Sequence, residues 1–184
     1  LERKFWRERE KELVNKLHIQ ATTDQLTGIY NRRVIFEALD EAMGKSKESK
    51  DRVFTTIMFD IDFFKQVNDN YGHAGGDAVL ISFAQLLQTE ISSPNIVGRI
   101  GGEEFLAILY LDPDQAKEFC TKLIKKINEN VVNFEGTDIR VSSSGGVAFS
   151  SETETSADLT NKADERLYEA KKNGRKRFKL IDRE

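Results

Sequence analysis

A glycine pair between two short apolar segments constrains the fold of this chain more than any other feature. Residues 96–100 and 105–111 are rich in apolar and β-branched side chains, and they flank Gly101-Gly102. Two such segments joined by a glycine turn predict a β-hairpin. Because a hairpin joins antiparallel strands, a sheet that contains it cannot be purely parallel.

Helix-like and strand-like segments alternate on both sides of this hairpin. Such alternation alone is typical of a parallel sheet, but the hairpin makes the sheet mixed. We therefore expect an α/β (α+β) fold, with a mixed, mostly antiparallel central sheet of about five strands covered by helices. The expected helices are 32–43, 77–91, one that begins at Pro113, and 157–173, and the further expected strands are 53–59, 139–149 and 178–181.

The composition is that of a globular chain without a strong charge bias. Of its 184 residues, 39% are hydrophobic and 32% are charged, and the net charge is −3. This net charge gives no general attraction to nucleic acid or to an anionic membrane surface. No apolar run approaches the roughly 20 residues of a membrane-spanning helix. We expect a cytoplasmic fragment of a larger, potentially membrane-anchored protein, and we expect the single cysteine, Cys120, to be buried in a helix.

The first residues form a separate charged segment, and we divide the chain into 1–21 and a domain over 22–184. Trp6, Leu13 and Leu17 follow the spacing of coiled-coil core positions, although Glu10 occupies one of them. Two interpretations stay open, namely an amphipathic helix that lies on its own domain and a linker that dimerises.

Acidic pairs occur at the ends of two predicted strands. Asp60 and Asp62 follow the strand 53–59, where α/β folds commonly bind ligands. Glu103 and Glu104 lie at the mouth of the hairpin. If these strands are neighbours, Asp60 and Glu103 can meet at a hard cation, as phosphoryl and nucleotidyl transfer require. The alternatives are a solvated strand end capped by Asp62 and a plain charged hairpin.

Two further groups of side chains suit a nucleotide. The Asn68 amide and the Asp77 carboxylate can pair with the edge of a base such as guanine, although Asp77 could instead cap a helix. Lys171 and Arg175 are four residues apart, so on a helix they would share a face and could clamp phosphates. The alternative for them is interaction with the helix dipole.

These clusters, taken in order, resemble the GGDEF family of diguanylate cyclases over roughly residues 22–179. The hairpin carries the family signature as its G-G-E-E-F variant at 101–105, and 24–33 is similar to the opening motif D-x-L-T-G-x-x-N-R-R. The other similar positions are 60–65, Asn68-Asp69, Gly72-His73, Gly76-Asp77, 144–148, Ala163-Asp164, Leu167-Tyr168, Ala170-Lys171 and Gly174-Arg175.

The resemblance implies a palm-like nucleotide cyclase fold and assigns roles to the residues. Asp60 and Glu103, with the Ile61 carbonyl, would bind Mg²⁺, for which Mn²⁺ is an alternative. Glu104 would help to deprotonate the attacking 3′-hydroxyl. Asn68 and Asp77 would read the guanine edge, and the triphosphate would be bound at Phe63, Phe64, Lys65, Gly102, Lys171 and Arg175.

The resemblance also implies partners. Each domain would hold one GTP and supply half of an active site, so that two copies must face each other to make cyclic di-GMP. Catalysis would therefore require a homodimer, and an upstream sensor or receiver domain would control it. No nucleic acid is expected to bind.

Three features depart from the family pattern or refine it. The inhibitory product site R-x-x-D is replaced by Ser92 and Asn95, so we expect product inhibition through it to be absent or weak. Lys176 stands where the family usually has Asn, and Asp77 favours GTP over adenine-containing substrates. Two other functions are weighed against the enzyme, namely a module that binds GTP without turnover and a mononucleotide cyclase on a related sheet.

Overall fold

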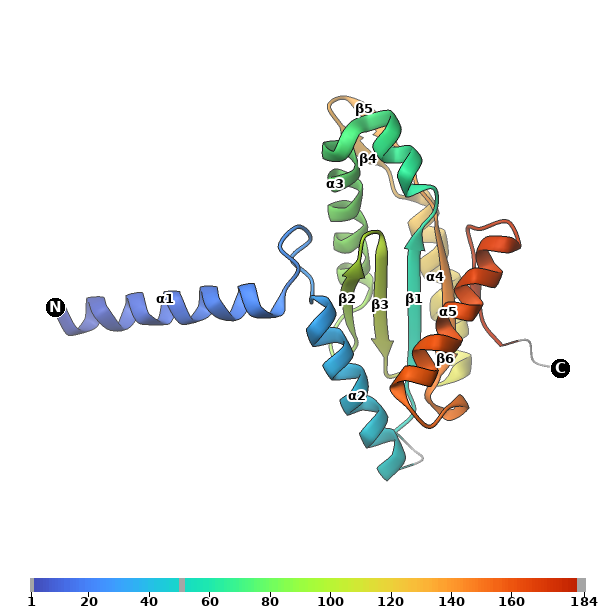
Figure 1. The fold of residues 1–184 in the computed structure, drawn as a ribbon, viewed down its shortest axis with the longest axis horizontal. Helices are drawn as coiled ribbons and strands as arrows, with labels where there is room; N and C mark the ends of the chain where they lie inside the picture. The colour runs from blue at the N-terminus through green and yellow to red at the C-terminus, as the bar shows by residue number, and fades with distance from the viewer. Residues whose placement is uncertain (1, 50–51, 182–184) are drawn as a thin grey trace.

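The computed structural model describes residues 2–49 and 52–181. A central sheet is flanked by helices, and one long N-terminal helix stands apart from them (Figure 1). The helices are α1 Glu2–Thr22, α2 Arg32–Glu48, α3 Phe64–Glu90, α4 Pro113–Glu129, the short 3-10 helix η1 Ser150–Glu152 and α5 Ser156–Lys172. The strands are β1 Thr55–Ile61, β2 Ile96–Gly101, β3 Glu104–Leu109, β4 Val132–Phe134, β5 Thr137–Ile139, β6 Ser143–Phe149 and β7 Phe178–Lys179.

The main sheet has five strands in the order β2-β3-β1-β6-β7. The pairs β2–β3, β3–β1 and β1–β6 are antiparallel, and β6–β7 is parallel. The expected mixed, mostly antiparallel sheet and the hairpin around Gly101-Gly102 are therefore confirmed. The central strand β1 is buried along its whole length, as an apolar, β-branched sequence covered on both faces must be.

Alternating side chains of the strands divide the core into two layers. Ile57 and Phe59 of β1, together with Phe105 of β3, pack against α3 and α4 on one face of the sheet. Met58 and Leu106, which alternate with them, pack against α2 and α5 on the other face. The two layers fix which face of the sheet each polar residue at a strand end must occupy.

Helix α4 shows how local sequence sets an element. The Asp112 carboxylate accepts hydrogen bonds from the backbone N–H groups of Asp114 and Gln115, and the Asp112 N–H donates to Gln115 Oε1. Pro113 is the first residue of the helix. Cys120 lies on the buried face of this helix, as predicted. Burial raises the pKa of its thiol to about 12.

Several predicted boundaries are wrong. The helix expected at 77–91 starts at Phe64 and is kinked at Gly72, which has φ 70° and ψ 174°. Glycines at 72 and 75–76 act as a breaker signal, while the first turns bury few side chains, so the apolar period is weak there. The strand expected at 139–149 begins at Ser143. Ile139 belongs instead to the β4–β5 hairpin, which the sequence pattern did not predict, and residues 140–142 connect this hairpin to β6.

Helix α5 lies against β6 at a position where only glycine fits. A Cβ atom on Gly146 would overlap the Ala163 carbonyl oxygen and the Leu167 nitrogen of α5. The absence of a side chain therefore lets the helix backbone approach the strand directly. This contact sets the height of α5 over the sheet and so places the side chains at its C-terminal end.

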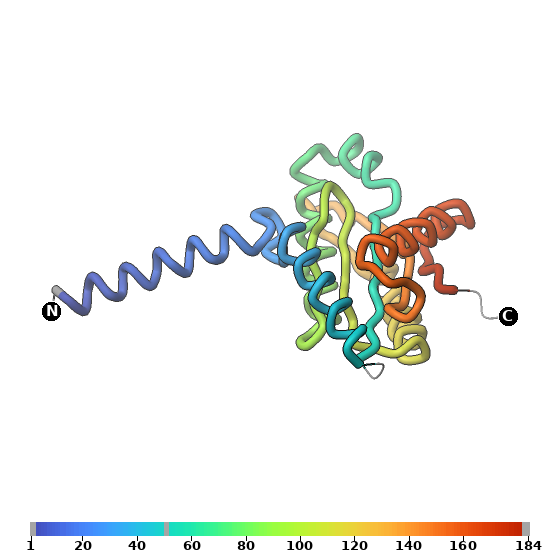
Figure 2. Tube along the Cα trace, turned by 60° about the horizontal axis from the view of Figure 1, so that its bottom comes forward, coloured from blue at the N-terminus to red at the C-terminus, as the bar shows by residue number. Residues whose placement is uncertain are grey.

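Helix α1 points away from the body in both views (Figures 1 and 2). Its apolar residues Phe5, Trp6, Leu13, Val14 and Leu17 are each more than half exposed. The prediction of a helix here is confirmed, and it does not lie on its own domain. Among the described residues, no helix combines the length and apolar character needed to cross a membrane.

Candidate active site

The end of β1 and the start of β3 bring two acidic side chains to one face of the sheet. Asp60 and Glu104 are paired in the antiparallel register, and paired residues project on the same face. Their neighbours two positions along, Met58 and Leu106, pack against α2 and α5. Asp60 and Glu104 therefore face the α5 side of the sheet, at the end of β1 that lies uppermost in Figure 1.

Asp60 is a buried carboxylate with a cation beside it. Only 7% of the residue is exposed, and Lys171 Nζ lies 2.9 Å from Asp60 Oδ2. Burial raises the pKa of Asp60; Lys171 opposes this rise, whereas Glu103 and Asp62 add to it. Such a group carries its charge at lower cost when a cation is close, and Lys171 supplies that cation here. Lys171 thus contacts the site directly and does more than complement the dipole of α5.

Asp62 has a different environment although it is only two residues away. Its carboxylate accepts hydrogen bonds from Ser142 Oγ and Ser144 Oγ, both at 2.6 Å, and from the Lys176 backbone N–H at 3.2 Å. The side chain is buried, so the solvated strand end that was the alternative is wrong. Asp62 ties the loop after α5 to the sheet instead of facing a ligand.

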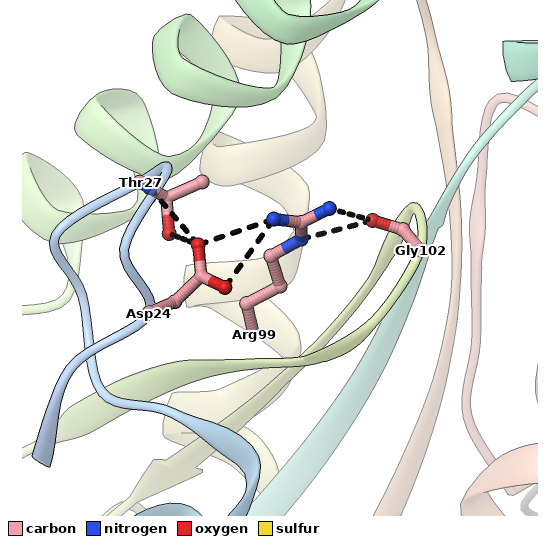
Figure 3. A network of polar contacts seen from close by, with 4 residues as sticks. All are labelled: Asp24, Thr27, Arg99 and Gly102. Atoms are coloured by element: carbon pink, nitrogen blue, oxygen red, sulfur yellow. Dashed lines mark hydrogen bonds and ion pairs between the residues drawn. The ribbon is translucent and has the colours of Figure 1, made fainter. Parts of the chain in front are cut away.

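Hydrogen bonds from Arg99 and from the Ile61 backbone fix the signature turn on its two sides. The guanidinium of Arg99 donates from Nε and Nη2 to the Gly102 carbonyl, at 2.9 and 2.8 Å. The Ile61 N–H donates to the Glu103 carbonyl at 3.2 Å. Asp24 accepts from Arg99 Nη1 on the far side of the guanidinium, and Figure 3 shows this network. Glu103 is thereby placed next to the end of β1.

Glu104 is the second perturbed carboxylate of the site. Burial raises its pKa, and the negative charge of Asp60 raises it further, while Lys171 acts in the opposite direction. Glu103 and Asp164 also add to the rise. A carboxylate with a raised pKa holds a proton more readily than an ordinary glutamate, which is a property useful in a proton acceptor.

Helix α3 begins next to this cluster without a side-chain cap. Its N-cap, Phe63, has φ 56°, and the Phe63 side chain makes no hydrogen bond to the N–H groups of the first turn. The N–H groups of a helix start carry partial positive charge and suit phosphate. Lys65 is exposed, but the Phe64 side chain lies in the core. The prediction that Phe64 lines the triphosphate is therefore limited to its backbone N–H.

Lys171 and Arg175 do not share a helical face, so that prediction is wrong. Helix α5 ends at Lys172, and Arg175 follows it with φ 61°. Its guanidinium stacks over the Phe63 ring, 4.5 Å from the centroid. Both cations still border the site, because Lys171 reaches the end of β1 and Arg175 reaches the start of α3.

The expected guanine-reading residues lie on α3. Gly76 leaves space for Asn68, because a Cβ atom at this position would overlap the Asn68 amide oxygen. Asp77 is exposed and lies inside the helix, five positions beyond the kink at Gly72. Asp77 therefore does not cap the start of a helix, which was the alternative for it.

Ser92 and Asn95 stand at the two positions of the inhibitory product site that was expected to be absent. Ser92 is exposed in the turn after α3. The Asn95 side chain accepts a hydrogen bond from the Tyr110 N–H at 2.8 Å and so connects this turn to the end of β3. No arginine occupies either position, and the absence of product inhibition through them stays a prediction.

The donor set fits a divalent cation that shares its shell with a nucleotide. In the part of the chain that the structure describes, no three acidic, histidine or cysteine side chains are placed to hold a metal alone. Asp60, Glu103 and the Ile61 carbonyl nevertheless offer only oxygen ligands. Mg²⁺ typically takes one or two carboxylates and completes its shell with phosphate and water.

Arg99 was not among the predicted site residues. The opening motif that contains Asp24 was recognised, but the motif gives no indication of its partner 75 residues later. The available signal was the position of Arg99, two residues before the glycine pair. A largely buried guanidinium there needs an anionic or carbonyl partner.

The chain is similar to diguanylate cyclases and to a response regulator from bacteria. The family model for the diguanylate cyclase GGDEF domain matches residues 21–177. Diguanylate cyclase DgcS of Shewanella oneidensis is 34% identical over 165 residues, which are 90% of this chain and 54% of that protein. Response regulator PleD of Caulobacter vibrioides is 37% identical over 162 residues, or 84% and 35% respectively. The chain spans about half, or less, of the length of these relatives.

Solved structures agree with this similarity. The coiled coil and GGDEF domain of DgcB from Caulobacter crescentus, in complex with c-di-GMP, has a TM-score of 0.87 at 25% identity, covering 98% of this chain and 96% of that chain. SiaD of Pseudomonas aeruginosa, a diguanylate cyclase in complex with its activator SiaC, has a TM-score of 0.84 at 31% identity, covering 97% and 68%. The chain belongs to the GGDEF domain family of diguanylate cyclases.

Proposed function

We propose that this domain condenses two molecules of GTP into cyclic di-GMP and releases two molecules of pyrophosphate. The observation that supports this most directly is the position of Asp60, Glu103, Glu104 and Lys171 around one end of β1, in a chain of the diguanylate cyclase family. We further propose that the chain is the cytoplasmic output part of a longer protein with an upstream sensor or receiver domain.

Each half-reaction joins the 3′-oxygen of one GTP to the α-phosphorus of the other. The bond from that phosphorus to the pyrophosphate oxygen breaks, and the 3′-hydroxyl loses its proton. The protein must therefore hold the triphosphate, neutralise part of its charge and accept a proton. The residues at the end of β1 provide groups for each of these tasks.

Enzymes of this family generally depend on a divalent metal, and we propose Mg²⁺, with Mn²⁺ as an alternative. Asp60, Glu103 and the Ile61 carbonyl would hold the ion, which when bound neutralises phosphate charge and activates the attacked phosphorus. Lys171, whose side chain is 32% exposed, is free to leave Asp60 for the phosphates once another cation is beside the carboxylate. Before nucleotide and metal bind, the ion pair between Lys171 and Asp60 would compensate the charge of the buried carboxylate.

The start of α3 would contact the remaining phosphate oxygens. The N–H groups of Phe63, Phe64 and Lys65 lie at the positive end of the helix, and Gly102 allows the backbone of the signature turn to approach a phosphate. Arg175 would add charge from the loop after α5. Further along α3, Asn68 and Asp77 would pair with the guanine edge, since an amide and a carboxylate match its acceptor and donors.

Glu104 would accept the proton of the 3′-hydroxyl. Its side chain projects on the same face as Asp60, and its raised pKa is consistent with transient protonation. The 3′-hydroxyl that attacks belongs to the nucleotide held by a second domain. Two copies must therefore face each other, and a homodimer is the catalytic unit in this proposal.

Helix α1 offers a surface for that dimer. The side chains of Trp6, Leu13 and Leu17 are exposed along one line of the helix. Spacing of this kind suits a parallel coiled coil, in which such residues pack against their copies. A change in register or rotation of the paired helices would alter the distance between two bound GTP molecules.

The decisive experiment is incubation of the purified chain with GTP and Mg²⁺, with chromatographic analysis of the products. Two molecules of pyrophosphate should accumulate for each molecule of cyclic di-GMP, because each of the two half-reactions releases one. Asp60→Asn should abolish turnover while the domain stays folded, because it removes a metal ligand and the partner of Lys171. Glu129→Gln, an exposed acid-to-amide change at the end of α4, is the matched control and should leave turnover unchanged.

The outcomes discriminate between functions. GTP binding without product from a confirmed dimer would contradict the proposal and favour a GTP-binding module. A cyclic mononucleotide as the product would indicate the related cyclase chemistry instead.

A further inference from the structure

Arg99 occupies an unusual place between the signature turn and the segment that follows α1. Its Nε and Nη2 donate to the Gly102 carbonyl, and its Nη1 lies 3.1 and 3.3 Å from the two carboxylate oxygens of Asp24 (Figure 3). The Arg99 and Asp24 side chains are only 15% and 24% exposed. A charge-assisted pair with this degree of burial is less screened than a surface pair.

Glu103 lies between two peptide groups that are each held by a hydrogen bond. The Gly102 carbonyl, on its N-terminal side, accepts from Arg99, and the Glu103 carbonyl accepts from the Ile61 N–H. Gly102 itself has φ +35°, so its conformation is not that of a regular strand. Hydrogen bonds therefore fix the backbone on both sides of the Glu103 side chain.

Asp24 is in turn fixed to the segment between α1 and α2. Its carboxylate accepts from the Thr27 N–H at 2.9 Å and from Thr27 Oγ1 at 2.7 Å. Burial raises the pKa of Asp24, but the hydrogen bonds from Thr27 and Arg99 outweigh burial and leave the pKa below its usual value. The carboxylate is thus a charged anchor for Arg99.

The same segment holds the C-terminal end of α1. Asn31 donates from its backbone N–H to the Thr22 carbonyl at 3.0 Å and from its side chain to the Ala21 carbonyl at 3.0 Å. Arg32 donates to the Ile100 carbonyl at 2.9 Å, next to the signature turn. The adjacent residues Asn31 and Arg32 therefore link the end of α1 to the backbone of Ile100, through one hydrogen-bonded residue on each side.

We propose that Arg99 is a positioning residue, which orients Glu103 for metal binding and makes that orientation depend on the α1 junction through Asp24. This inference rests on the proposed role of Glu103 as a metal ligand. In this proposal Arg99 does not act on the substrate, because Nε, Nη1 and Nη2 each already donate to Gly102 or Asp24. Groups that support metal ligands in this way typically change metal affinity by about 10- to 100-fold when removed.

The test compares the whole chain with its variants Arg99→Ala, Arg99→Lys and Asp24→Asn. The primary measurement is the dissociation constant for Mn²⁺ in the presence of a GTP analogue with a non-hydrolysable α,β-bridge, followed by electron paramagnetic resonance. Arg33→Ala is the matched control, because Arg33 lies in the first turn of α2 and contacts Glu37 and the Ala21 carbonyl but not the signature turn.

We expect Arg99→Ala to weaken Mn²⁺ binding by about 10-fold or more, with binding of the analogue in the absence of metal unchanged. Arg99→Lys should be weakened too, because a single ammonium cannot reproduce the fork between a carbonyl and a carboxylate. Asp24→Asn should show a smaller effect, since the acceptor atoms partly remain. Arg33→Ala should bind Mn²⁺ as the unchanged chain does.

Equal Mn²⁺ affinity in folded Arg99→Lys and in the unchanged chain would overturn the inference, as would an equal loss in Arg33→Ala. The measurement does not require turnover. If the unchanged chain bound Mn²⁺ but made no cyclic di-GMP, the proposed activity would fail while the positioning role would still be decided by the variants.

Discussion

At the scale of single residues, neighbouring carboxylates acquire different roles from their surroundings. Asp60 and Asp62 look alike in the sequence, and both are buried. Asp62 is satisfied by two serine hydroxyls and a backbone N–H, whereas Asp60 has Lys171 beside it and a raised pKa caused first by burial. A carboxylate that is not fully compensated by the protein is the one suited to a cation.

Glu104→Gln should separate proton transfer from binding. The amide keeps the size of the side chain but cannot accept the 3′-hydroxyl proton, so kcat should fall by about 100- to 10,000-fold. Binding of GTP and metal should be nearly unchanged, because Glu104 is not among the proposed ligands. Pre-steady-state kinetics together with calorimetric titration of GTP would check this, and an unchanged kcat would remove Glu104 from the mechanism.

At the scale of elements, strand order was predictable only in part. The hairpin signal and the alternation of helix-like and strand-like segments predicted a mixed sheet, and the acids after the expected strand 53–59 and in the hairpin predicted the metal-binding candidates. The pairing of β1 with both β3 and β6 depends on contacts far apart in the chain, which local patterns do not contain. For the same reason the Asp24–Arg99 pair was not predicted, and the β4–β5 hairpin is too short to give a pattern.

Gly146→Ala should test how closely α5 must approach β6. The added Cβ would overlap backbone atoms of α5, which cannot rotate away as a side chain can. The helix would have to shift, so we expect a loss of about 1–3 kcal/mol of stability, with a further loss of activity as Lys171 moves relative to Asp60. Thermal and urea unfolding, with a GTP assay, would measure both effects.

Gly44→Ala is the control for that change. Gly44 lies within α2, and nothing would come within 4 Å of an added Cβ. Alanine is favoured over glycine inside a helix by roughly 0.5–1 kcal/mol. This variant should therefore be slightly more stable and equally active, and a loss of stability similar to that of Gly146→Ala would contradict the explanation by close approach.

The pair formed by Arg166 of α5 and Glu152 of η1 should make stability depend on pH. Arg166 donates two hydrogen bonds to the Glu152 carboxylate and one to the Val147 carbonyl. Burial raises the pKa of Glu152, but the hydrogen bonds from Arg166 and from the Phe149 N–H outweigh it, so the pKa lies below its ordinary value of 4.5. This stabilisation is complete above pH 4.5 and is lost as the pH falls through the lowered pKa.

Glu152→Gln should therefore destabilise the fold by about 2–4 kcal/mol at pH 7, because Arg166 stays buried without its charged partner. The difference in unfolding free energy between this variant and the unchanged chain should shrink below pH 4.5. Urea unfolding from pH 7 to pH 3 would show it. A difference that is constant over this range would mean that the ionised carboxylate is not the source of the stability.

At the scale of the whole molecule, the body and α1 differ in how far their apolar side chains are buried. The body buries two complete core layers, whereas α1 leaves its large apolar side chains in solvent. An isolated helix of this length is marginal in water unless it packs against something. In the dimer proposed above, a second copy of α1 would cover these side chains and would also bring two half-sites into one particle.

Leu13→Glu should dissociate that particle. In paired helices, the new carboxylate would lose its water next to the same carboxylate of the second helix. The variant should therefore be monomeric by analytical ultracentrifugation, and it should be nearly inactive at low concentration. Asn15→Glu changes an outward position of the same helix and should keep both the dimer and the activity. A Leu13→Glu variant with full activity at low concentration would show that α1 is not required for assembly.

The burial of Cys120 in α4 gives this association a convenient reporter. It is the only cysteine of the chain, and a thiol whose pKa is raised to about 12 is almost entirely protonated at neutral pH and reacts slowly with maleimides. A Leu17→Cys variant would therefore carry one reactive thiol per chain. A spin label or fluorophore attached there would report the spacing of two helices without background, and it could follow that spacing while GTP binds.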